Sequence, residues 1–330
     1  MKMMNTLYKN VLTVFIVILM ALPARPFTDD CRGDVNQDNL VNITDVTTMI
    51  QYLLNDNAPE SVLWLVDITG DGYFNISDVT ALIDYLLTDD WKWPEPAPPL
   101  PENAQVFTVN GVPFAMIYVE EGTFMMGNNS YEDTRPVHQV TLSSYWIGET
   151  EVTADLWFAV MGEFTPYIRS RGLQPAAYLS WDNCQSFIQK LNELTGMSFR
   201  LPTEAQWEFA ARGGNLSKGY QYSGSDDVNA VAWYQGTSHP SPWWPYVKTK
   251  APNELGLYDM SGSLWEWCQD CYYQRYLSAD PVTDPLNYYE PPGYLVVRGG
   301  STDSGALDCR VDTRSYFYHG DTSGGLRLAL

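Results

Sequence analysis

Hydrophobic residues recur at helical spacing in two short segments near the N-terminus. Apolar residues at positions i, i+3, i+4 and i+7 lie on one face of an α-helix. The segments DVTTMIQYLL (45–54) and DVTALIDYLL (78–87) share seven of ten residues at an offset of 33 positions. This pattern therefore predicts a duplicated unit with one helix in each copy. The apolar positions are Val46, Met49, Ile50 and Leu53, then Val79, Leu82, Ile83 and Leu86.

Each predicted helix follows a loop with oxygen-bearing side chains at loop positions 1, 3, 5, 9 and 12. Calcium loops of the EF-hand type place ligands at these positions and take a backbone carbonyl from position 7. The sequence therefore predicts two calcium sites. The ligands of the first are Asp34, Asn36, Asp38, Leu40 (carbonyl), Asn42 and Asp45, and those of the second are Asp67, Thr69, Asp71, Tyr73 (carbonyl), Asn75 and Asp78.

With one loop and one helix in each copy, residues 31–89 resemble a type I dockerin. The resemblance implies a small all-α module with paired EF-hand-like calcium loops. It also implies a cohesin-like protein or a surface scaffold as the partner. Residues 90–105 follow as a linker, because the five prolines within 94–101 favour an extended, semi-rigid chain.

The region 106–330 mixes two kinds of pattern. Segments 115–119 and 138–147 alternate as strands do, whereas 153–162, 180–196 and 203–214 have helical character. Ser180 and Thr203 stand where helix N-caps are expected. After Gly214 the chain is rich in turn residues and shows little periodicity.

Several ordered blocks of this region resemble the formylglycine-generating, or sulfatase-modifying-factor, family. The resemblance implies an α+β, C-type-lectin-like fold with much irregular structure. The blocks are MIYVEEGTFMMG (116–127), RPVHQVTLSSYWIGETEVT (135–153), FRLPTEAQWEFAARGG (199–214), PNELGLYDMSGSLWEWCQD (252–270) and RGGSTDSGALDCRVDTRS (298–315).

In catalytic members of that family, two cysteines shortly after the Arg-Gly-Gly-Ser turn hold copper as thiolates. Here the first sulfur after Ser301 is Cys309. Alignment on Arg310 and Arg314 places Ala306 at the second reactive cysteine, and the shorter loop leaves no position for the first. We therefore expect no catalytic residues and a non-catalytic ligand-binding domain. The alternatives are an oxidoreductase of the family with other metal ligands, and an adhesin or scaffold component that recognises protein.

Small, polar and aromatic residues fill the C-terminal block between fixed arginines. Such residues are typical of recognition surfaces, and the block also resembles the variable region of lectin-fold proteins diversified by retroelements, although ordinary loop drift explains it as well. Dockerins usually carry polysaccharide-degrading cargo, so carbohydrate is the leading ligand class by analogy. The expected ligand-binding residues are Thr302, Asp303, Ser304, Ala306, Asp312, Thr313, Tyr316, Tyr318 and His319.

Two further features carry weaker signals. The chain has five cysteines, at positions 31, 184, 268, 271 and 309, and the Cys268–Cys271 spacing favours a structural disulfide or buried thiols over redox chemistry. The stretch from Gly262 to Glu266 matches one that helps to hold a structural calcium in the resembled family. Ser263 replaces the usual asparagine there, which weakens the case for a further calcium near Glu266.

The N-terminus and the charge indicate where the protein works. Lys2 and Lys9 precede an apolar run at 11–22, so residues 1–25 read as a signal peptide, and we expect a secreted or extracellular protein that can attach to a cell surface. No segment reads as a membrane span. A formal charge of −21 disfavours nucleic acid as a partner.

Overall fold

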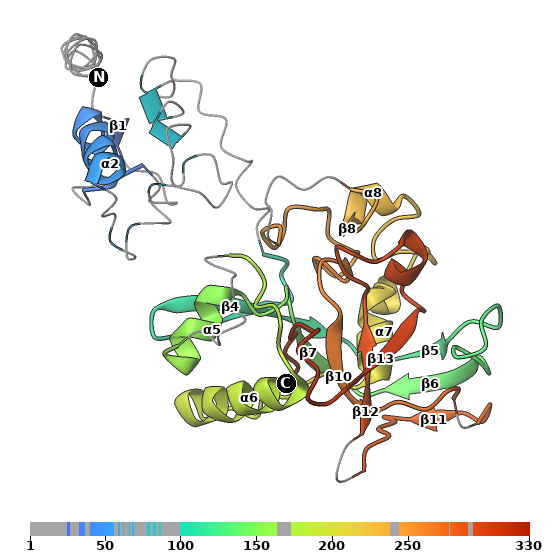
Figure 1. The fold of residues 1–330 in the computed structure, drawn as a ribbon. Helices are drawn as coiled ribbons and strands as arrows, with labels where there is room; N and C mark the ends of the chain where they lie inside the picture. The colour runs from blue at the N-terminus through green and yellow to red at the C-terminus, as the bar shows by residue number, and fades with distance from the viewer. Residues whose placement is uncertain are drawn as a thin grey trace. The chain divides into compact units, whose positions relative to one another are not determined.

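The computed structural model describes residues 25–26, 33–36, 40–55, 59, 62, 66, 68, 78–79, 82–83, 86, 100–163, 173–237, 244–276, 278–289 and 293–330. The chain divides into two compact units, Met1–Ala97 and Pro98–Leu330 (Figure 1). The predicted signal peptide is almost wholly outside the described residues. So are most of the second calcium loop and most of the proline linker.

The N-terminal unit contains the first predicted helix. Helix α2 (Ile43–Asn55) buries Val46 and Met49 completely. Val79, Leu82 and Leu86 of the second copy are buried in the same cluster. The apolar faces of both repeats therefore form one core. A two-residue strand, β2 (Leu40–Val41), precedes α2 and pairs with β1 (Arg25–Pro26).

The large unit begins with an antiparallel sheet in the order β3 (Ala104–Val109), β4 (Val112–Val119) and β7 (Tyr145–Gly148). The last residues of the chain run beside β7, where Leu330 and Trp146 exchange backbone hydrogen bonds of 3.0 and 3.1 Å (Figure 1). The single strand predicted over 138–147 is wrong. It is two strands, because β6 (His138–Leu142) belongs to a different sheet from β7.

Two further three-stranded sheets complete the scaffold. One has the order β11 (Val282–Thr283), β6 and β5 (Gly122–Met126). The other has the order β10 (Glu266–Cys271), β12 (Tyr294–Arg298) and β13 (Arg314–Tyr318), all antiparallel. Short parallel strands β8 (Ala232–Trp233) and β9 (Ser261–Gly262) pair separately.

The three helices expected in this region begin where the sequence predicts, and the structure adds one short helix and two 3-10 turns. They are α5 (Ala154–Met161), α6 (Trp181–Thr195) and α7 (Glu204–Ala211), with a short α8 (Val228–Val231) and two 3-10 turns, η2 (Gly214–Leu216) and η3 (Ala306–Cys309). The Ser180 hydroxyl accepts from Asn183 N at 3.1 Å, and the Thr203 hydroxyl accepts from Gln206 N at 3.2 Å. Each bond satisfies one of the free N–H groups at a helix start.

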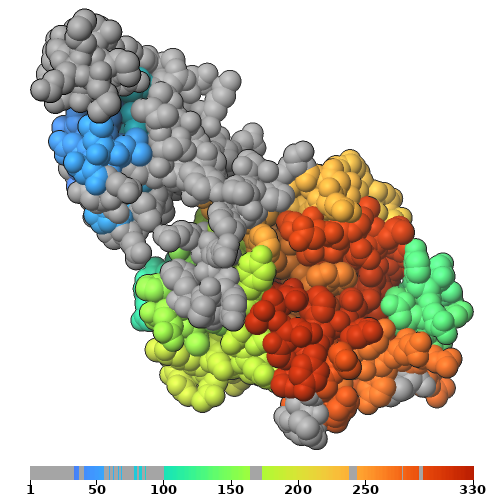
Figure 2. Space-filling model, in the orientation of Figure 1, coloured from blue at the N-terminus to red at the C-terminus, as the bar shows by residue number. Residues whose placement is uncertain are grey.

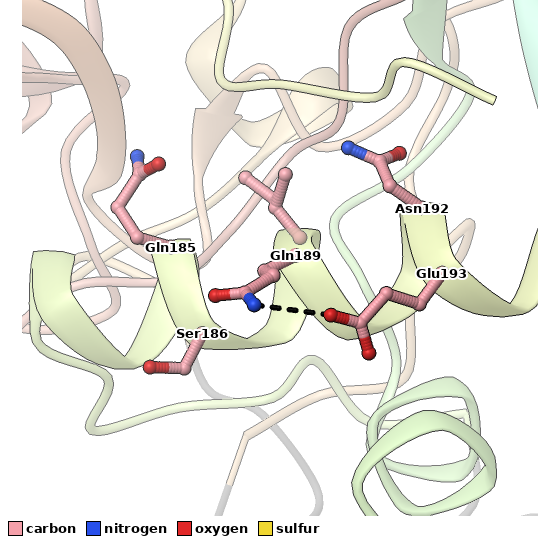
Figure 3. A pocket seen from close by; sticks show the side chains of 6 residues that line it. Gln185, Ser186, Gln189, Asn192 and Glu193 are labelled. Carbon is pink, nitrogen blue, oxygen red and sulfur yellow. Dashed lines mark hydrogen bonds between the residues drawn. The ribbon is translucent and has the colours of Figure 1, made fainter. Parts of the chain in front are cut away.

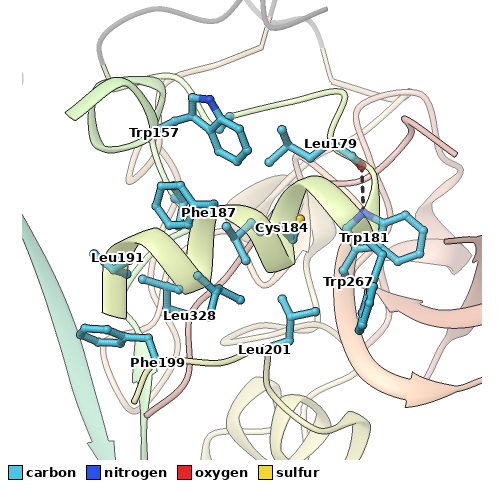
Figure 4. Packing of buried hydrophobic residues seen from close by; sticks show 14 of the residues in the cluster. Trp157, Leu179, Trp181, Cys184, Phe187, Leu191, Phe199, Leu201, Trp267 and Leu328 are labelled. Atoms are coloured by element: carbon cyan, nitrogen blue, oxygen red, sulfur yellow. Dashed lines mark hydrogen bonds between the residues drawn. The ribbon is translucent and has the colours of Figure 1, made fainter. Parts of the chain in front are cut away.

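Helix α6 packs its apolar face into the largest hydrophobic cluster of the described residues. Its inward face carries Cys184, Phe187 and Leu191, and Trp157 of α5 stacks on Phe187 with ring centres 5.0 Å apart (Figure 4). The outward face is polar. This division follows the 3.6-residue period of the sequence.

Helix α7 is buried on all sides, including its acidic residues. Glu204 and Glu208 meet Arg298 of β12 and Arg314 of β13. Arg314 forms a bidentate pair with Glu204 at 2.7 and 2.5 Å, and Arg298 Nη2 pairs with Glu208. Arg298 Nε also lies 3.1 Å from Glu204 Oε1, although at an angle outside hydrogen-bond geometry. These pairs connect the helix to the sheet that lies in front of it in Figure 1.

We expect Arg298→Met to lower the free energy of unfolding by about 3 kcal/mol or more, because it leaves buried carboxylates short of a partner. The matched control is Arg212→Met. Arg212 also pairs with Glu208, but its side chain is 23% exposed, so its loss should cost about 1 kcal/mol. Urea unfolding of the full chain, followed by tryptophan fluorescence, measures both. Equal losses in the two variants would contradict the importance of the buried pair.

Candidate functional site

The turn after β12 fixes the start of the candidate site. Gly299 and Gly300 have φ angles of 97° and 81°, which side-chain-bearing residues rarely adopt. A Cβ atom on Gly300 would lie 2.9 Å from Cys309 Sγ. The turn is tied to β9 by a 2.8 Å bond from Gly262 N to Gly299 O. Both glycines are therefore required by the backbone that brings Cys309 beneath the turn.

The loop after this turn is closed by its own hydrogen bonds. Ser304 N donates to Ser301 O at 3.0 Å, and Ser301 N donates to Ser304 Oγ at 3.0 Å. Gly305 N then donates to Asp308 Oδ2 at 3.0 Å as η3 begins at Ala306. Ala306, which aligns with a reactive cysteine of the family, thus begins a short turn closed by its own hydrogen bonds, and its side chain is only a methyl group.

Cys309 is buried in an apolar cluster with Tyr222, Val231 and Ala232. Burial raises the pKa of its thiol to about 12, and the charge of Asp308 adds to this shift. The reactive and metal-binding form of cysteine is the thiolate, which this environment disfavours. No other cysteine of the described residues belongs to this cluster. The donor atoms present here do not fit a two-thiolate copper site.

The remaining described cysteines are buried thiols, which is one of the two alternatives that the sequence left open. Cys184, Cys268 and Cys271 form no disulfide, and burial raises the pKa of Cys184 and Cys268. Cys31 lies outside the described residues. Cys268 and Cys271 therefore serve as buried packing residues.

The predicted ligand-binding residues fall into two classes of exposure. Thr302 and Asp312 are only 7% exposed. The Asp312 carboxylate accepts from Arg310 at 3.0 and 2.7 Å and from Asn128 Nδ2 at 2.6 Å, which makes it part of the framework. The side chains that reach the surface, wholly or in part, are those of Asp303, Ser304, Ala306, Thr313, Tyr316, Tyr318 and His319.

The exposed residues do not converge on one pocket. Strand β13 separates them, because Arg298 pairs with Arg314 at one end and Tyr294 pairs with Tyr318 at the other. A five-residue strand spans about 13 Å between its end residues. The loop 302–306 and the Tyr318 end therefore lie at opposite ends of a band, which Figure 2 shows in red across one face.

Four tyrosines form a packed row at the Tyr318 end, and we name Tyr272, Tyr294, Tyr316 and Tyr318 the tyrosine ladder. Ring centres are 4.3 Å apart for Tyr272 and Tyr316, 5.3 Å for Tyr294 and Tyr316, and 5.9 Å for Tyr294 and Tyr318. Tyr294, Tyr316 and Tyr318 are 54%, 46% and 48% exposed. Exposed aromatic side chains gathered in this way are typical of contact surfaces.

Sequence reasoning missed Tyr272 and Tyr294. Tyr272 and Tyr294 precede the C-terminal block in the sequence, and they lie beside Tyr316 and Tyr318 only because their strands pair. Tyr294 is the cross-strand partner of Tyr318, and Tyr272 N donates to Tyr294 O at 2.8 Å. A prediction that β12 pairs with β13 could have found Tyr294, but the segment YLVVR does not alternate in polarity.

Neither the pocket on α6 nor the surroundings of Glu266 has the side chains that a catalytic or metal site requires. The shallow pocket on the outer side of α6 is lined by neutral polar residues, Ile188 and one carboxylate, Glu193, which accepts from Gln189 Nε2 at 3.0 Å (Figure 3). At Glu266, both carboxylate oxygens bind Arg327 and one also binds Trp207 Nε1 at 2.7 Å. These engaged oxygens do not fit a further calcium site.

Hydrogen bonds to Asp45 hold the described part of the first predicted calcium loop. Asp45 accepts backbone N–H groups from Asn36 at 3.1 Å and from Asn42 at 2.9 Å, which shapes the loop. Burial, and the charge of the nearby Asp34, raise the pKa of Asp45 to about 6. A bound cation would favour the ionised carboxylate. Asp78 of the second loop is buried, whereas Asp38, Asp67, Thr69, Asp71, Tyr73 and Asn75 lie outside the described residues.

The structure describes five side chains of the predicted calcium loops, namely Asp34, Asn36, Asn42 and Asp45 of the first loop and Asp78 of the second. Among the residues that the structure describes, no three histidine, cysteine, aspartate or glutamate side chains gather as a metal site would require. The predicted calcium sites also use asparagine side chains and backbone carbonyls, which are not among these four residue types.

Comparison with known proteins decides the family. The sulfatase-modifying factor enzyme 1-like domain matches residues 104–330. The chain belongs to this family. The type I dockerin domain matches residues 32–87. Within the described residues, no helix has the length and apolar character to cross a bilayer.

The curated relatives of this chain carry names that refer to different functions. The chaperone protein LppX of Paenibacillus barcinonensis is 31% identical over 201 residues, covering 46% of this chain and 70% of the relative. The formylglycine-generating enzyme of Streptomyces coelicolor is 32% identical over 178 residues, covering 48% and 52%. The chain spans about half or less of the length of several curated relatives.

Among solved structures, variable protein 1 of Treponema denticola is similar in fold and sequence. Its TM-score is 0.61 at 29% identity, and the match covers 68% of this chain and 98% of that one. The mixed α/β architecture of the large unit is therefore that of the family.

We expect no oxidation of the cysteine in a sulfatase-motif peptide, with or without added copper, because Ala306 and the buried Cys309 cannot supply paired thiolates. Mass spectrometry of the incubated peptide measures the product. Cys309→Ser is the control variant. Turnover that survives this substitution would require a different site, and turnover lost with it would show that the loop alignment is wrong.

Proposed function

We propose that this chain is a secreted, dockerin-bearing protein whose sulfatase-modifying-factor-type domain binds a ligand and does not catalyse. One observation carries the proposal. The segment from Arg298 to Cys309 lies within the family match and keeps the Arg-Gly-Gly-Ser turn, while its single thiol is buried and its pKa is raised to about 12. An oxidoreductase of this type needs accessible thiolates at this place.

The tyrosine ladder is the proposed ligand-binding surface. Tyrosine supplies a large contact area and a hydroxyl group at a low cost in conformational entropy. The rings of the ladder contact one another, and Arg314 lies beneath Tyr272 at 4.9 Å from its ring centre. This packing holds the exposed rings in place before a ligand arrives, which favours binding.

The N-terminal unit is proposed to be an all-α module with two EF-hand-like calcium loops that docks to a cohesin-like protein or surface scaffold. Its type I dockerin match supports this role. The shared core of the two repeats is consistent with it, since calcium commonly stabilises units too small to bury a large core. Docking would bring the ladder to an extracellular assembly.

We expect two calcium ions to bind the full chain, because each predicted loop supplies at least four oxygen-bearing side chains. Isothermal calorimetry measures the stoichiometry. Asp34→Ala and Asp67→Ala should each remove one ion. Asp303→Ala, which removes an exposed carboxylate outside the loops, is the control. A stoichiometry near zero for the wild-type chain would refute the calcium assignment.

A ligand found on a glycan or surface-protein array should lose affinity when Tyr316 or Tyr318 becomes alanine, by about 1 kcal/mol or more for each anchor. Thermal stability should change little, because both side chains are about half exposed. Phe158→Ala, an exposed aromatic on α5, is the control. Unchanged binding by both tyrosine variants would place the ligand face elsewhere.

A further inference from the structure

Three rings at the Tyr318 end of the ladder, those of Tyr294, Tyr316 and Tyr318, are about half exposed. Tyr294 meets Tyr316 and Tyr318 at interplanar angles of 83° and 73°, and the other neighbour of Tyr318 is His319, with ring centres 4.4 Å apart. Within the described residues, none of the Tyr294, Tyr316 or Tyr318 hydroxyls is hydrogen-bonded to a protein group. These groups are therefore free to contact a ligand.

Two carboxylates flank the same end. Asp321 Oδ2 accepts from Tyr318 N at 3.0 Å, and Asp182 Oδ2 lies 2.8 Å from His319 Nδ1. The Asp182 side chain is 56% exposed, and Asp321 is exposed as well. Aromatic rings and carboxylates side by side form an environment that attracts cations.

The arginines of this sheet are buried in ion pairs and leave no exposed positive charge on it. Arg314 shares a face of β13 with Tyr316 and Tyr318, but it is 5% exposed and paired with Glu204. The exposed Arg135 and Arg275 belong to loops that adjoin Tyr276, at the Tyr272 end. The Tyr318 end therefore keeps its negative charge, in a chain whose formal charge is −21.

We propose that the corner formed by Tyr294 and Tyr318, between Asp182 and Asp321, binds a lysine or arginine side chain of a basic protein surface. This inference rests on the proposed ligand-binding function and names its partner class. Charge complementarity favours it, because the two carboxylates attract a cationic group over a long range and repel an anionic glycan.

The test uses the calcium-loaded full chain and a labelled dodecapeptide in which arginine alternates with serine and glycine. A second peptide carries glutamate in place of each arginine. Fluorescence anisotropy measures both dissociation constants. We expect the arginine peptide to bind more tightly, and Tyr318→Ala, Asp182→Asn and Asp321→Asn each to weaken it about fivefold. Both asparagine substitutions keep an oxygen that can accept the existing hydrogen bond.

The matched control is Glu193→Gln, which removes one exposed negative charge from α6 and should change the affinity less than twofold. Equal weakening by this control would show diffuse attraction and overturn the proposal. A neutral glycan whose binding is lost in Tyr318→Ala, with the arginine peptide unaffected, would overturn the basic partner and keep the ligand face. If neither the arginine peptide nor a neutral glycan binds more tightly than the glutamate peptide, both the basic partner and the ligand face are overturned.

Discussion

The buried ion pairs between α7 and the sheet β10–β12–β13 set the geometry on which the candidate surface depends. Glu204 and Glu208 hold Arg298 and Arg314, which face each other across β12 and β13. Side chains alternate along a strand, so burial of Arg314 on this face fixes Tyr316 and Tyr318 two and four residues further on. The ion pair that anchors Arg314 therefore also fixes the face of β13 on which the two half-exposed tyrosines lie.

The frame and the chemistry of the family are separable in this fold. The glycines at 299 and 300 keep the backbone of the turn because their positive φ angles demand it. The residues that follow face no such demand, since their loop closes through its own serine and aspartate hydrogen bonds. Reactive side chains can thus be replaced there while the buried arginines and glycines still define the scaffold.

Local signals explain what the sequence could predict. The starts of α6 and α7 follow from capping residues at Ser180 and Thr203, and α2 follows from its apolar period. The ladder could not be predicted in full, because Tyr272 and Tyr294 reach Tyr316 only through pairing of strands that show no alternation. The partner of Arg314 lies 110 residues earlier, at Glu204, and the burial of Asp312 depends on Asn128. Such contacts depend on tertiary packing rather than on local pattern.

Binding of copper(I) tests most directly the claim that the scaffold persists without the reactive thiols. The full, folded chain would be titrated against a coloured copper(I) chelator, with metal transfer followed by absorbance. The account predicts that the chelator keeps the metal, because Cys309 is buried with its thiol pKa raised to about 12 and shares its cluster with no other described cysteine. Stoichiometric transfer of one copper(I) ion to the native chain, lost in Cys309→Ser, would contradict it.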